Sequence, residues 1–324
     1  MKTWYVESLN NITLHEAPLV RRENEVKLKI SKVVLSSTDI SYFASEQGNL
    51  KVPGHSAIAH VSEADEESGF KLGARAVISP FLTVNEQGVK TIKTMGVDVD
   101  GLLADFVCVP QQNVYVLPDG VTDEQAIFAE CIAFGVKIFE EIDCNKGDYV
   151  VIVGASTLGL ILAQLAMYYQ YVPILVDFDA DKLKYVEQWG IYYTINPTYD
   201  NLERKVEEIT GGRMAELMAY VGECITCDAA MRLVKNGGTA IIAGYSSLFK
   251  HKIDMDTVLK KQLTVKGIGN GDGEMATAIN LLANNVIKTD GMINSRIKFA
   301  DVPAMVAECV KFPYQYNKIL VTIE

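Results

Sequence analysis

The sequence predicts an α/β protein that combines a β-rich amino-terminal half with a doubly wound parallel sheet. Up to about residue 118, short runs with partial period-two alternation are broken by glycine and proline, and no helical period persists. From residue 122 onward, short apolar runs alternate with helix-forming segments, as in a parallel sheet with helices on both faces. A length of 324 residues suits two domains.

The expected elements follow from these two patterns. The first half should form a compact, mostly antiparallel unit with strands at residues 4–6, 12–14, 25–30, 33–35, 57–61, 76–78 and 106–109. Thr122 suits the N-cap of the first helix. Helices are then expected at 123–142, 160–169, 183–188, 202–210, 229–234, 275–284 and 302–311, and strands at 149–153, 172–176, 192–195, 217–221, 239–243, 263–268, 293–299 and 318–323.

Residues 147–182 have the layout of a βαβ unit that binds a dinucleotide. A fully apolar strand ends at the turn Gly154-Ala155-Ser156-Thr157-Leu158-Gly159, and a helix and a second strand follow. Gly154 permits a sharp turn, and Gly159 permits close packing of the helix on the sheet. The unsatisfied amides at the start of the helix suit a pyrophosphate, so this turn, including Thr157 and Leu158, is a candidate cofactor contact.

Asp177 closes the second strand, near the position of the acid that binds a ribose 2′-OH in such units. Its negative charge should repel a 2′-phosphate, so NAD(H) is favoured over NADP(H). The middle glycine of the motif is replaced by Ser156, whose small hydroxyl can fit and can donate a hydrogen bond to the pyrophosphate. Two alternatives are a sheet segment that binds nothing and a membrane span over residues 149–178, although the interspersed glycine and polar residues favour strand–helix–strand.

Composition limits the classes of partner. The formal net charge of −11 and the pI near 5.0 argue against nucleic acid and against anionic membrane surfaces. The amino terminus has no basic region followed by an apolar core, so no signal peptide is expected. The 6 cysteines are too scattered for a disulfide framework, which favours a reducing, cytoplasmic location.

Several short motifs occur together in one order along nearly the whole chain. They are Pro53-Gly54-His55, residues 69–75, residues 96–106, Leu117-Pro118-Asp119-Gly120, residues 177–182, Gly237-Gly238 before a strand that ends at Gly244, and Asn317-Lys318. This order resembles the medium-chain dehydrogenase/reductase superfamily, the zinc-type alcohol and polyol dehydrogenases. The resemblance implies a GroES-like catalytic domain from residues 1–131 and 272–324, and a Rossmann domain from residues 132–271. It also implies that Asp177 and Lys182 grip the adenosine ribose and that Gly244 lies at the cofactor.

The family's catalytic zinc site is degenerate in this chain. The cysteine ligand of the family falls on Ser36, and the glutamate after His55 is Ser56. His55 remains, and Glu130 matches a further glutamate ligand of the polyol branch, so these two residues are weak candidates for a metal site. A neutral serine hydroxyl is a poor zinc ligand, and catalytic zinc generally needs three protein ligands. Zinc is therefore doubtful.

Three other features bear on proton transfer and on metal binding. Thr38 matches the hydroxyl that passes the alcohol proton in zinc-containing relatives, and Asp39 follows it; as alternatives, these two could form only a turn or helix cap, and His55 could be a core histidine. The lobe that holds a structural zinc needs four cysteines, and residues 84–101 contain none. Cys224-x-x-Cys227 could be a metal or redox pair, but a helix reading is favoured because no second pair lies nearby.

Three functions remain open from the sequence. The leading hypothesis is an NAD(P)(H)-dependent oxidoreductase of a small alcohol, polyol or carbonyl compound, with Ser36, Thr38, Asp39, His55 and Glu130 as candidate catalytic residues and without a full zinc site. The alternatives are a zinc-free quinone or enone reductase and a catalytically silent nucleotide-binding homologue. A homodimer or homotetramer is expected, because residues 263–268 should form an unpaired strand at the edge of the parallel sheet.

Overall fold

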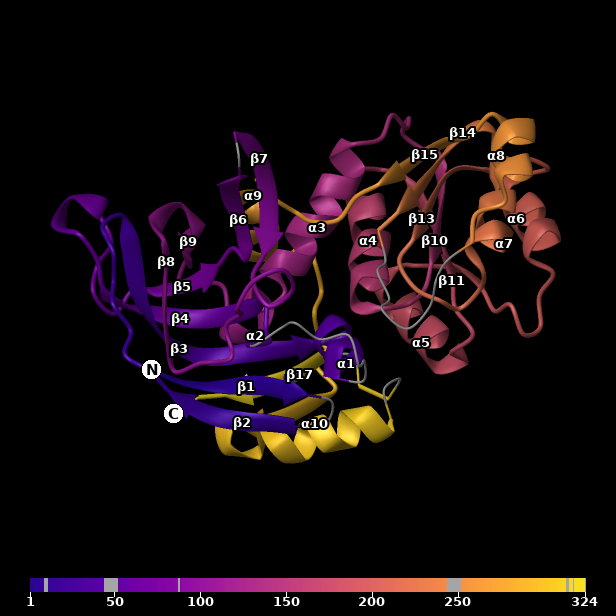
Figure 1. The fold of residues 1–324 in the computed structure, drawn as a ribbon. Helices are drawn as coiled ribbons and strands as arrows, with labels where there is room; N and C mark the ends of the chain where they lie inside the picture. The colour runs from indigo at the N-terminus through magenta and orange to yellow at the C-terminus, as the bar shows by residue number, and fades with distance from the viewer. Residues whose placement is uncertain are drawn as a thin grey trace. The chain divides into compact units, whose positions relative to one another are not determined.

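The computed structural model describes residues 1–8, 11–43, 52–86, 88–243, 252–312, 315–316 and 318–323 (Figure 1). Gly244 and Asn317, which the sequence linked to family motifs, lie outside these residues. The chain divides into two compact units. Unit 1 comprises Met1–Glu130, Met275–Asn284 and Thr289–Glu324, and unit 2 comprises Cys131–Glu274 and Asn285–Lys288. The sequence prediction places the domain boundaries at residues 131/132 and 271/272. It assigns all of residues 272–324 to the first domain, whereas residues 272–274 and Asn285–Lys288 lie in unit 2.

Within the described residues, unit 1 is built on a seven-stranded sheet in the order β16-β17-β3-β4-β5-β9, with β8 also paired to β3. β3 runs antiparallel to β4, β8 and β17, whereas β16 and β17 are parallel. Two hairpins, β1–β2 and β6–β7, accompany the sheet. The bounds are β1 Lys2–Ser8, β2 Asn11–Glu16, β3 Glu25–Ser36, β4 Ser56–Glu63, β5 Arg75–Ile78, β6 Phe81–Glu86, β7 Val89–Thr94, β8 Phe106–Pro110, β9 Val114–Val116, β16 Ser295–Lys298 and β17 Lys318–Thr322.

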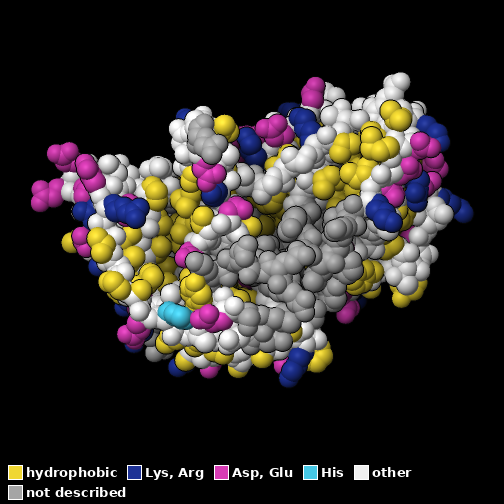
Figure 2. Space-filling view, viewed as in Figure 1, with side chains coloured by type: hydrophobic (Ala, Val, Ile, Leu, Met, Phe, Trp, Pro, Cys, Tyr) yellow, Lys and Arg dark blue, Asp and Glu magenta, His cyan; other side chains and the backbone are white. Residues whose placement is uncertain are grey.

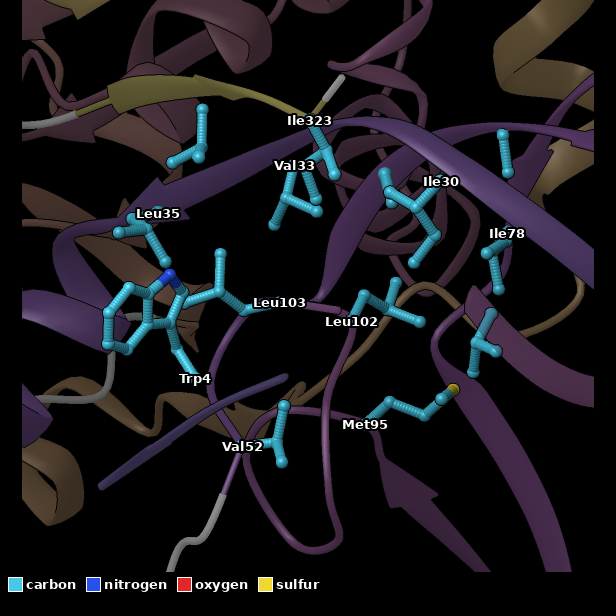
Figure 3. Packing of buried hydrophobic residues seen from close by; sticks show 14 of the residues in the cluster. Trp4, Ile30, Val33, Leu35, Val52, Ile78, Met95, Leu102, Leu103 and Ile323 are labelled. Carbon is cyan, nitrogen blue, oxygen red and sulfur yellow. The ribbon is translucent and has the colours of Figure 1, made fainter. Parts of the chain in front are cut away.

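The helices of unit 1 are short. They are α1 Ser37–Phe43, α2 Asp123–Ala126, α9 Met275–Ala283 and α10 Val302–Lys311, with 3-10 turns at Glu66–Ser68, Gln111–Asn113 and Phe299–Asp301. Apolar side chains from the sheet, from β1 and from the loop that ends at Leu102 and Leu103 form one core (Figure 3). Because this core contains β3 and the chain that precedes β4, it fixes the two segments that carry Ser36 and His55.

Two expectations for unit 1 were wrong. The separate strands at 25–30 and 33–35 form the single strand β3, because a register shift between Ile30 and Lys32 accommodates the polar residues at the break. The helix at 123–142 is divided into α2 and α3, Ala129–Glu140. At the division, the carbonyl of Ile127 accepts a hydrogen bond of 2.6 Å from the hydroxyl of Ser56.

Unit 2 contains a parallel sheet that has six strands within the described residues, in the order β12-β11-β10-β13-β14-β15. The chain order reverses between β10 and β13, which makes this pair the switch point where doubly wound sheets bind ligands. Figure 1 shows α4 on one side of the sheet and α6, α7 and α8 on the other. The strands are β10 Tyr149–Val153, β11 Val172–Val176, β12 Tyr193–Ile195, β13 Ala215–Tyr220, β14 Val234–Ile242 and β15 Thr264–Gly267.

The helices of unit 2 after α3 are α4 Thr157–Tyr168, α5 Ala180–Tyr185, α6 Leu202–Thr210, α7 Cys227–Arg232 and α8 Met255–Lys261, with a 3-10 turn at Val186–Trp189. The sequence predicted no element where α8 lies, and it started α4 and α5 three residues too late. Both of these helices begin directly after side-chain N-caps, Ser156 and Asp179. No helix of the described residues has the length and apolarity needed to cross a bilayer.

Figure 2 shows the side chains of one face of the molecule by type. On the face shown in Figure 2, acidic and basic side chains are interspersed among the residues drawn in colour.

Candidate functional site

The turn at the switch point of unit 2 is packed as tightly as the sequence motif requires. Gly154 has a φ of +103°, and a Cβ on it would lie 2.6 Å from the Cα of Gly222, which follows β13. A Cβ on Gly159 would lie 1.9 Å from the carbonyl oxygen of Gly154. Only glycine fits at either position, so α4 begins directly above the carboxyl ends of β10 and β13.

Ser156 uses its hydroxyl inside the protein. The hydroxyl caps α4 by accepting the amide of Gly159 at 3.3 Å, and it donates to the carbonyl of Val221 at 3.2 Å. In this structure the one proton of the hydroxyl is directed to Val221, so the predicted donation from Ser156 to a pyrophosphate would replace that hydrogen bond. The amides of Thr157 and Leu158 lie in the same first turn, where a helix offers no backbone acceptor. Among the described residues of this turn, these two amides are the donors left for an anion.

Asp177 anchors this turn to β11. It is 6% exposed, and its two carboxylate oxygens accept the amides of Ala155 at 2.6 Å and Asp179 at 2.9 Å. A carboxylate oxygen has two acceptor sites, so each oxygen can still accept a hydroxyl. Lys182 forms an ion pair with Asp179, with Nζ 3.6 Å from Oδ2. Asp177 and Lys182, which the family resemblance links to the ribose, thus lie at the same end of the sheet, with Asp179 between them.

A second cluster lies in unit 1, where β3 ends. The Oγ of Ser36 lies 3.1 Å from Oδ2 of Asp39 and 3.3 Å from Nε2 of His55. The carboxylate of Asp39 also accepts the amides of Ser36 and Gly54, both at 2.8 Å. All three side chains are buried, with residue exposures of 4%, 1% and 7% for Ser36, Asp39 and His55. Strand pairing brings them together, because Val34 of β3 lies opposite Ser56 of β4.

His55 lies between two carboxylates. Its Nδ1 is 3.5 Å from Oδ2 of Asp39, and its Nε2 is 3.9 Å from Oε2 of Glu130, in the first turn of α3. Within the described residues, Nδ1 is buried and has no hydrogen-bond partner. Thr38 joins the cluster through its amide, which donates to Oγ of Ser36 at 3.3 Å. The structure therefore brings together all five candidate residues of unit 1.

The loop that carries His55 owes its path to backbone packing. Gly54 has a φ of +90°, and the carbonyls of Pro53 and Gly54 accept the amides of Leu103 and Leu102. A Cβ on Gly101 would lie 2.4 Å from the oxygen of Gly54. The glycines of the motifs at 53–55 and 96–106 thus let two loops meet backbone to backbone, which positions His55 over the end of β3.

The donor set around His55 does not fit a zinc ion. A hydroxyl stands at residue 36, and the hydroxyl of Ser56 points to the carbonyl of Ile127. Around Nε2 of His55, the described residues supply His55 and Glu130 as ordinary zinc ligands, one fewer than catalytic zinc uses, because the carboxylate of Asp39 faces Nδ1 instead. Across the described residues, no three His, Cys, Asp or Glu side chains are arranged to hold a metal, so Cys131 beside Glu130 supplies no third ligand.

Two other features of the sequence have structural explanations. The hairpin β6–β7 fills much of the segment where the family lobe binds structural zinc, and its backbone ladder pairs Phe81 with Thr94 through Glu86 with Val89. Burial raises the pKa of Cys224 to about 12, with a further contribution from the charge of Asp177, and burial raises the pKa of Cys227 to about 11. Protonated thiols are weak nucleophiles and weak metal ligands.

A cavity of about 360 Å³ lies in unit 2, and none of the candidate catalytic or cofactor-contacting residues lines it. Lys137, Glu141 and residues 266–270 line it. The amine of Lys266 already donates to the carbonyl of Glu141 at 2.6 Å, and Lys137 pairs with the carboxylate of Glu141 at 3.4 Å. Since its charged groups are paired with one another, the hydrogen-bonded cluster at His55 and the turn at Gly154 remain the candidate sites.

Comparisons with known proteins place this fold. Residues 22–119 match the family of alcohol dehydrogenase GroES-like domains, and residues 157–284 match zinc-binding dehydrogenases. An uncharacterized zinc-type alcohol dehydrogenase-like protein of Haemophilus influenzae is 25% identical to this chain, and the match covers 98% of both chains. Sorbitol dehydrogenase 2 of Saccharomyces cerevisiae is 24% identical, and the match covers 91% of this chain and 90% of that protein. The structure of an Escherichia coli alcohol dehydrogenase complexed with NADH has a TM-score of 0.86 at 19% identity, covering 99% of both chains.

The chain belongs to the medium-chain dehydrogenase/reductase superfamily, with unit 1 as its GroES-like part and unit 2 as its Rossmann part. Both family models are those of alcohol or zinc-binding dehydrogenases, so within that superfamily the chain is alcohol dehydrogenase-like.

Proposed function

We propose that the chain interconverts a small alcohol or polyol and its carbonyl compound with NAD(H), without a full catalytic zinc site. The observation that carries the proposal is the buried carboxylate of Asp177, held beside the turn at the switch point of a parallel sheet. Relatives of the chain include sorbitol dehydrogenases, which supports a polyol-like substrate.

The cofactor preference rests on the charge at Asp177. When bound, NAD(H) supplies or accepts the hydride. Asp177 would accept the ribose hydroxyls through its remaining acceptor sites, and the amides of Thr157 and Leu158 would donate to the pyrophosphate. The carboxylate is almost completely buried, so a 2′-phosphate would face a negative charge that water screens poorly. We therefore expect NADH to bind at least about tenfold more tightly than NADPH.

The reacting oxygen would be polarised by hydrogen bonds from unit 1. His55 offers Nε2, and Thr38, whose amide donates to Oγ of Ser36, carries a candidate hydroxyl. The carboxylate of Asp39 accepts the amides of Ser36 and Gly54 and the hydroxyl of Ser36, so the end of β3 and the loop before His55 are fixed before a substrate arrives. Such fixed donors stabilise a developing alkoxide without reorganising in the reaction.

Titration calorimetry with NADH and NADPH tests the cofactor assignment, and equal affinities would contradict it. Turnover with polyols, simple alcohols, quinones and enones tests the reaction. Activity with a polyol or alcohol and NAD supports the proposal. Activity restricted to quinones or enones would favour the zinc-free reductase reaction, and NADH binding without turnover of any of these compounds would favour a silent nucleotide-binding role.

We also propose a homodimer that pairs through β15. This strand is an edge of the sheet in unit 2, and Val265 is 38% exposed on it. The amide of Ile268 points inward to the carbonyl of Ile242. Since amide direction alternates along a strand, the amide of Val265 should point outward and be available to a second copy. Sedimentation should give a dimer, and Val265→Pro should shift it towards monomer; a monomeric wild-type chain at micromolar concentration would refute this.

A further inference from the structure

The cluster at His55 keeps the spacing of a metal site. The Nε2 of His55 is 3.3 Å from Oγ of Ser36 and 3.9 Å from Oε2 of Glu130. Two ligands of one tetrahedral zinc ion lie roughly 3.3 to 3.7 Å apart, given zinc–ligand bonds of about 2.0 to 2.3 Å. The Ser36–His55 distance lies within this range, and the Glu130–His55 distance exceeds it slightly, so Nε2 of His55 has a neighbour at ligand spacing on each of β3 and α3.

A carboxylate also lies on the side of His55 where metal-binding histidines normally have a hydrogen-bond acceptor, although no hydrogen bond joins the two groups in this structure. Metal-ligating histidines usually direct the second ring nitrogen at a carboxylate, which fixes the orientation of the ring. Here Nδ1 of His55 faces Oδ2 of Asp39 at 3.5 Å, and within the described residues it has no hydrogen-bond partner. Asp39 is itself held by two backbone amides. The buried ring thus presents Nε2 to Ser36 and Glu130.

Of the two serines that replace family ligands, only one lies against this nitrogen. Ser36 contacts Nε2 of His55, whereas Ser56 directs its hydroxyl to the carbonyl of Ile127. The hydroxyl of Ser36 is neutral at physiological pH, and its proton can be donated to Asp39. A thiolate at the same position would bring the negative charge and the soft sulfur atom that zinc prefers.

We infer that the pocket around His55 is a zinc site short of one ligand, and that Ser36 alone keeps it free of metal. The substitution Ser36→Cys would complete a set of one cysteine, one histidine and one glutamate, with the fourth position open to water. This inference refines the metal-free site proposed above. Its test measures metal and not turnover, so its failure is distinct from failure of the proposed function.

The experiment compares the wild-type chain with Ser36→Cys, Ser37→Cys and Ser56→Glu. Each protein is dialysed against a chelator, checked for folding by circular dichroism, and titrated with zinc and with cobalt. Ser37 is the matched control because it is exposed and adjacent to Ser36, yet contacts none of the three proposed ligand atoms in the interactions described above. Ser36→Cys should bind about one zinc ion per chain, at least about a hundredfold more tightly than the wild type.

Cobalt gives a spectroscopic signature, since thiolate ligation produces a sulfur-to-cobalt charge-transfer band. The band should appear in Ser36→Cys alone and should weaken in Ser36→Cys combined with Glu130→Gln. The wild type, Ser37→Cys and Ser56→Glu should bind well under one zinc ion per chain.

Two results would overturn the inference. Stoichiometric, chelator-resistant zinc in the wild type would show that a hydroxyl suffices, and this measurement stands whether or not the variants fold. A folded Ser36→Cys protein with wild-type zinc affinity would show that Ser36 is not the missing ligand.

Discussion

Each unit contains a buried aspartate whose carboxylate holds two backbone amides beside a serine-bearing turn. Asp39 in unit 1 holds Ser36 and Gly54, and Asp177 in unit 2 holds Ala155 and Asp179. The two carboxylates differ in their other contacts. Asp39 also accepts Oγ of Ser36 and faces Nδ1 of His55, whereas the serine near Asp177 turns away to cap α4.

This difference shows that the same interaction, a buried carboxylate that accepts two backbone amides, can support either a side-chain cluster or a ligand-binding turn. Around Asp39, the hydroxyl, the imidazole and the carboxylates contact one another, so the side chains form a closed cluster that can polarise an oxygen. Around Asp177, the protein satisfies the backbone and leaves acceptor sites and first-turn amides open to a ligand. Substitutions at the two aspartates and at Ser156 separate these purposes.

Asp39→Ala should have the largest effect on stability. The variant leaves the buried amides of Ser36 and Gly54 without an acceptor, so unit 1 should lose about 4 kcal/mol of unfolding free energy. In a Trp189→Phe background, Trp4 is the remaining tryptophan and its fluorescence reports urea unfolding of unit 1. The control Asp119→Ala, at an exposed site, should change the value by no more than about 0.5 kcal/mol. A loss below about 1 kcal/mol for Asp39→Ala would mean that the carboxylate is not an anchor.

Asp177→Ala should cost less stability and should also alter cofactor choice. We expect a loss of about 2 kcal/mol in unit 2, because two amides lose their acceptor at a site with slight solvent access. The preference for NADH over NADPH should narrow by about tenfold, since the repulsive charge is removed. Calorimetric titration of both cofactors measures the ratio. The control Asp181→Ala removes an exposed charge from α5 and should leave the ratio of the two affinities unchanged. An unchanged ratio in a folded Asp177→Ala protein would assign the preference to another residue.

Ser156→Gly should have the smallest effect. It restores the family residue and removes the cap on α4, which should cost about 1 kcal/mol or less. NADH affinity should stay within about threefold of wild type, because the hydroxyl is bound to Gly159 and Val221 in the protein itself. A folded Ser156→Gly protein with a tenfold weaker affinity for NADH would show that the hydroxyl contacts the cofactor.

Local sequence was sufficient for the elements that have a strong period or a strong turn. The apolar runs of β10 and β11, the turn that begins at Gly154 and the acid that ends β11 are all local signals, so unit 2 could be assigned as a doubly wound sheet. The N-cap residues Ser156 and Asp179 mark the starts of α4 and α5, and these local signals could have corrected the two predicted helix starts, which lie three residues too late.

The composition of the two candidate sites was likewise fixed by the residues present. A serine in place of a cysteine removes a thiolate whatever the fold does, and an aspartate at residue 177 carries its charge into any dinucleotide site. These are chemical properties of single side chains, and motif order sufficed to place them in one superfamily.

Tertiary structure decided where each polar atom points. Ser36 and His55 meet because β3 and β4 pair in one register, and a shift of either strand by one residue would turn the side chains of that strand to the other face. In the sequence, Ser36, Ser56 and Ser156 each simply replace a family residue. In the structure, the hydroxyl of Ser36 contacts His55, that of Ser56 contacts Ile127, and that of Ser156 caps α4. A hydroxyl can rotate to whichever partner the packed backbone brings near, so its role depends on contacts between distant segments that no local pattern encodes.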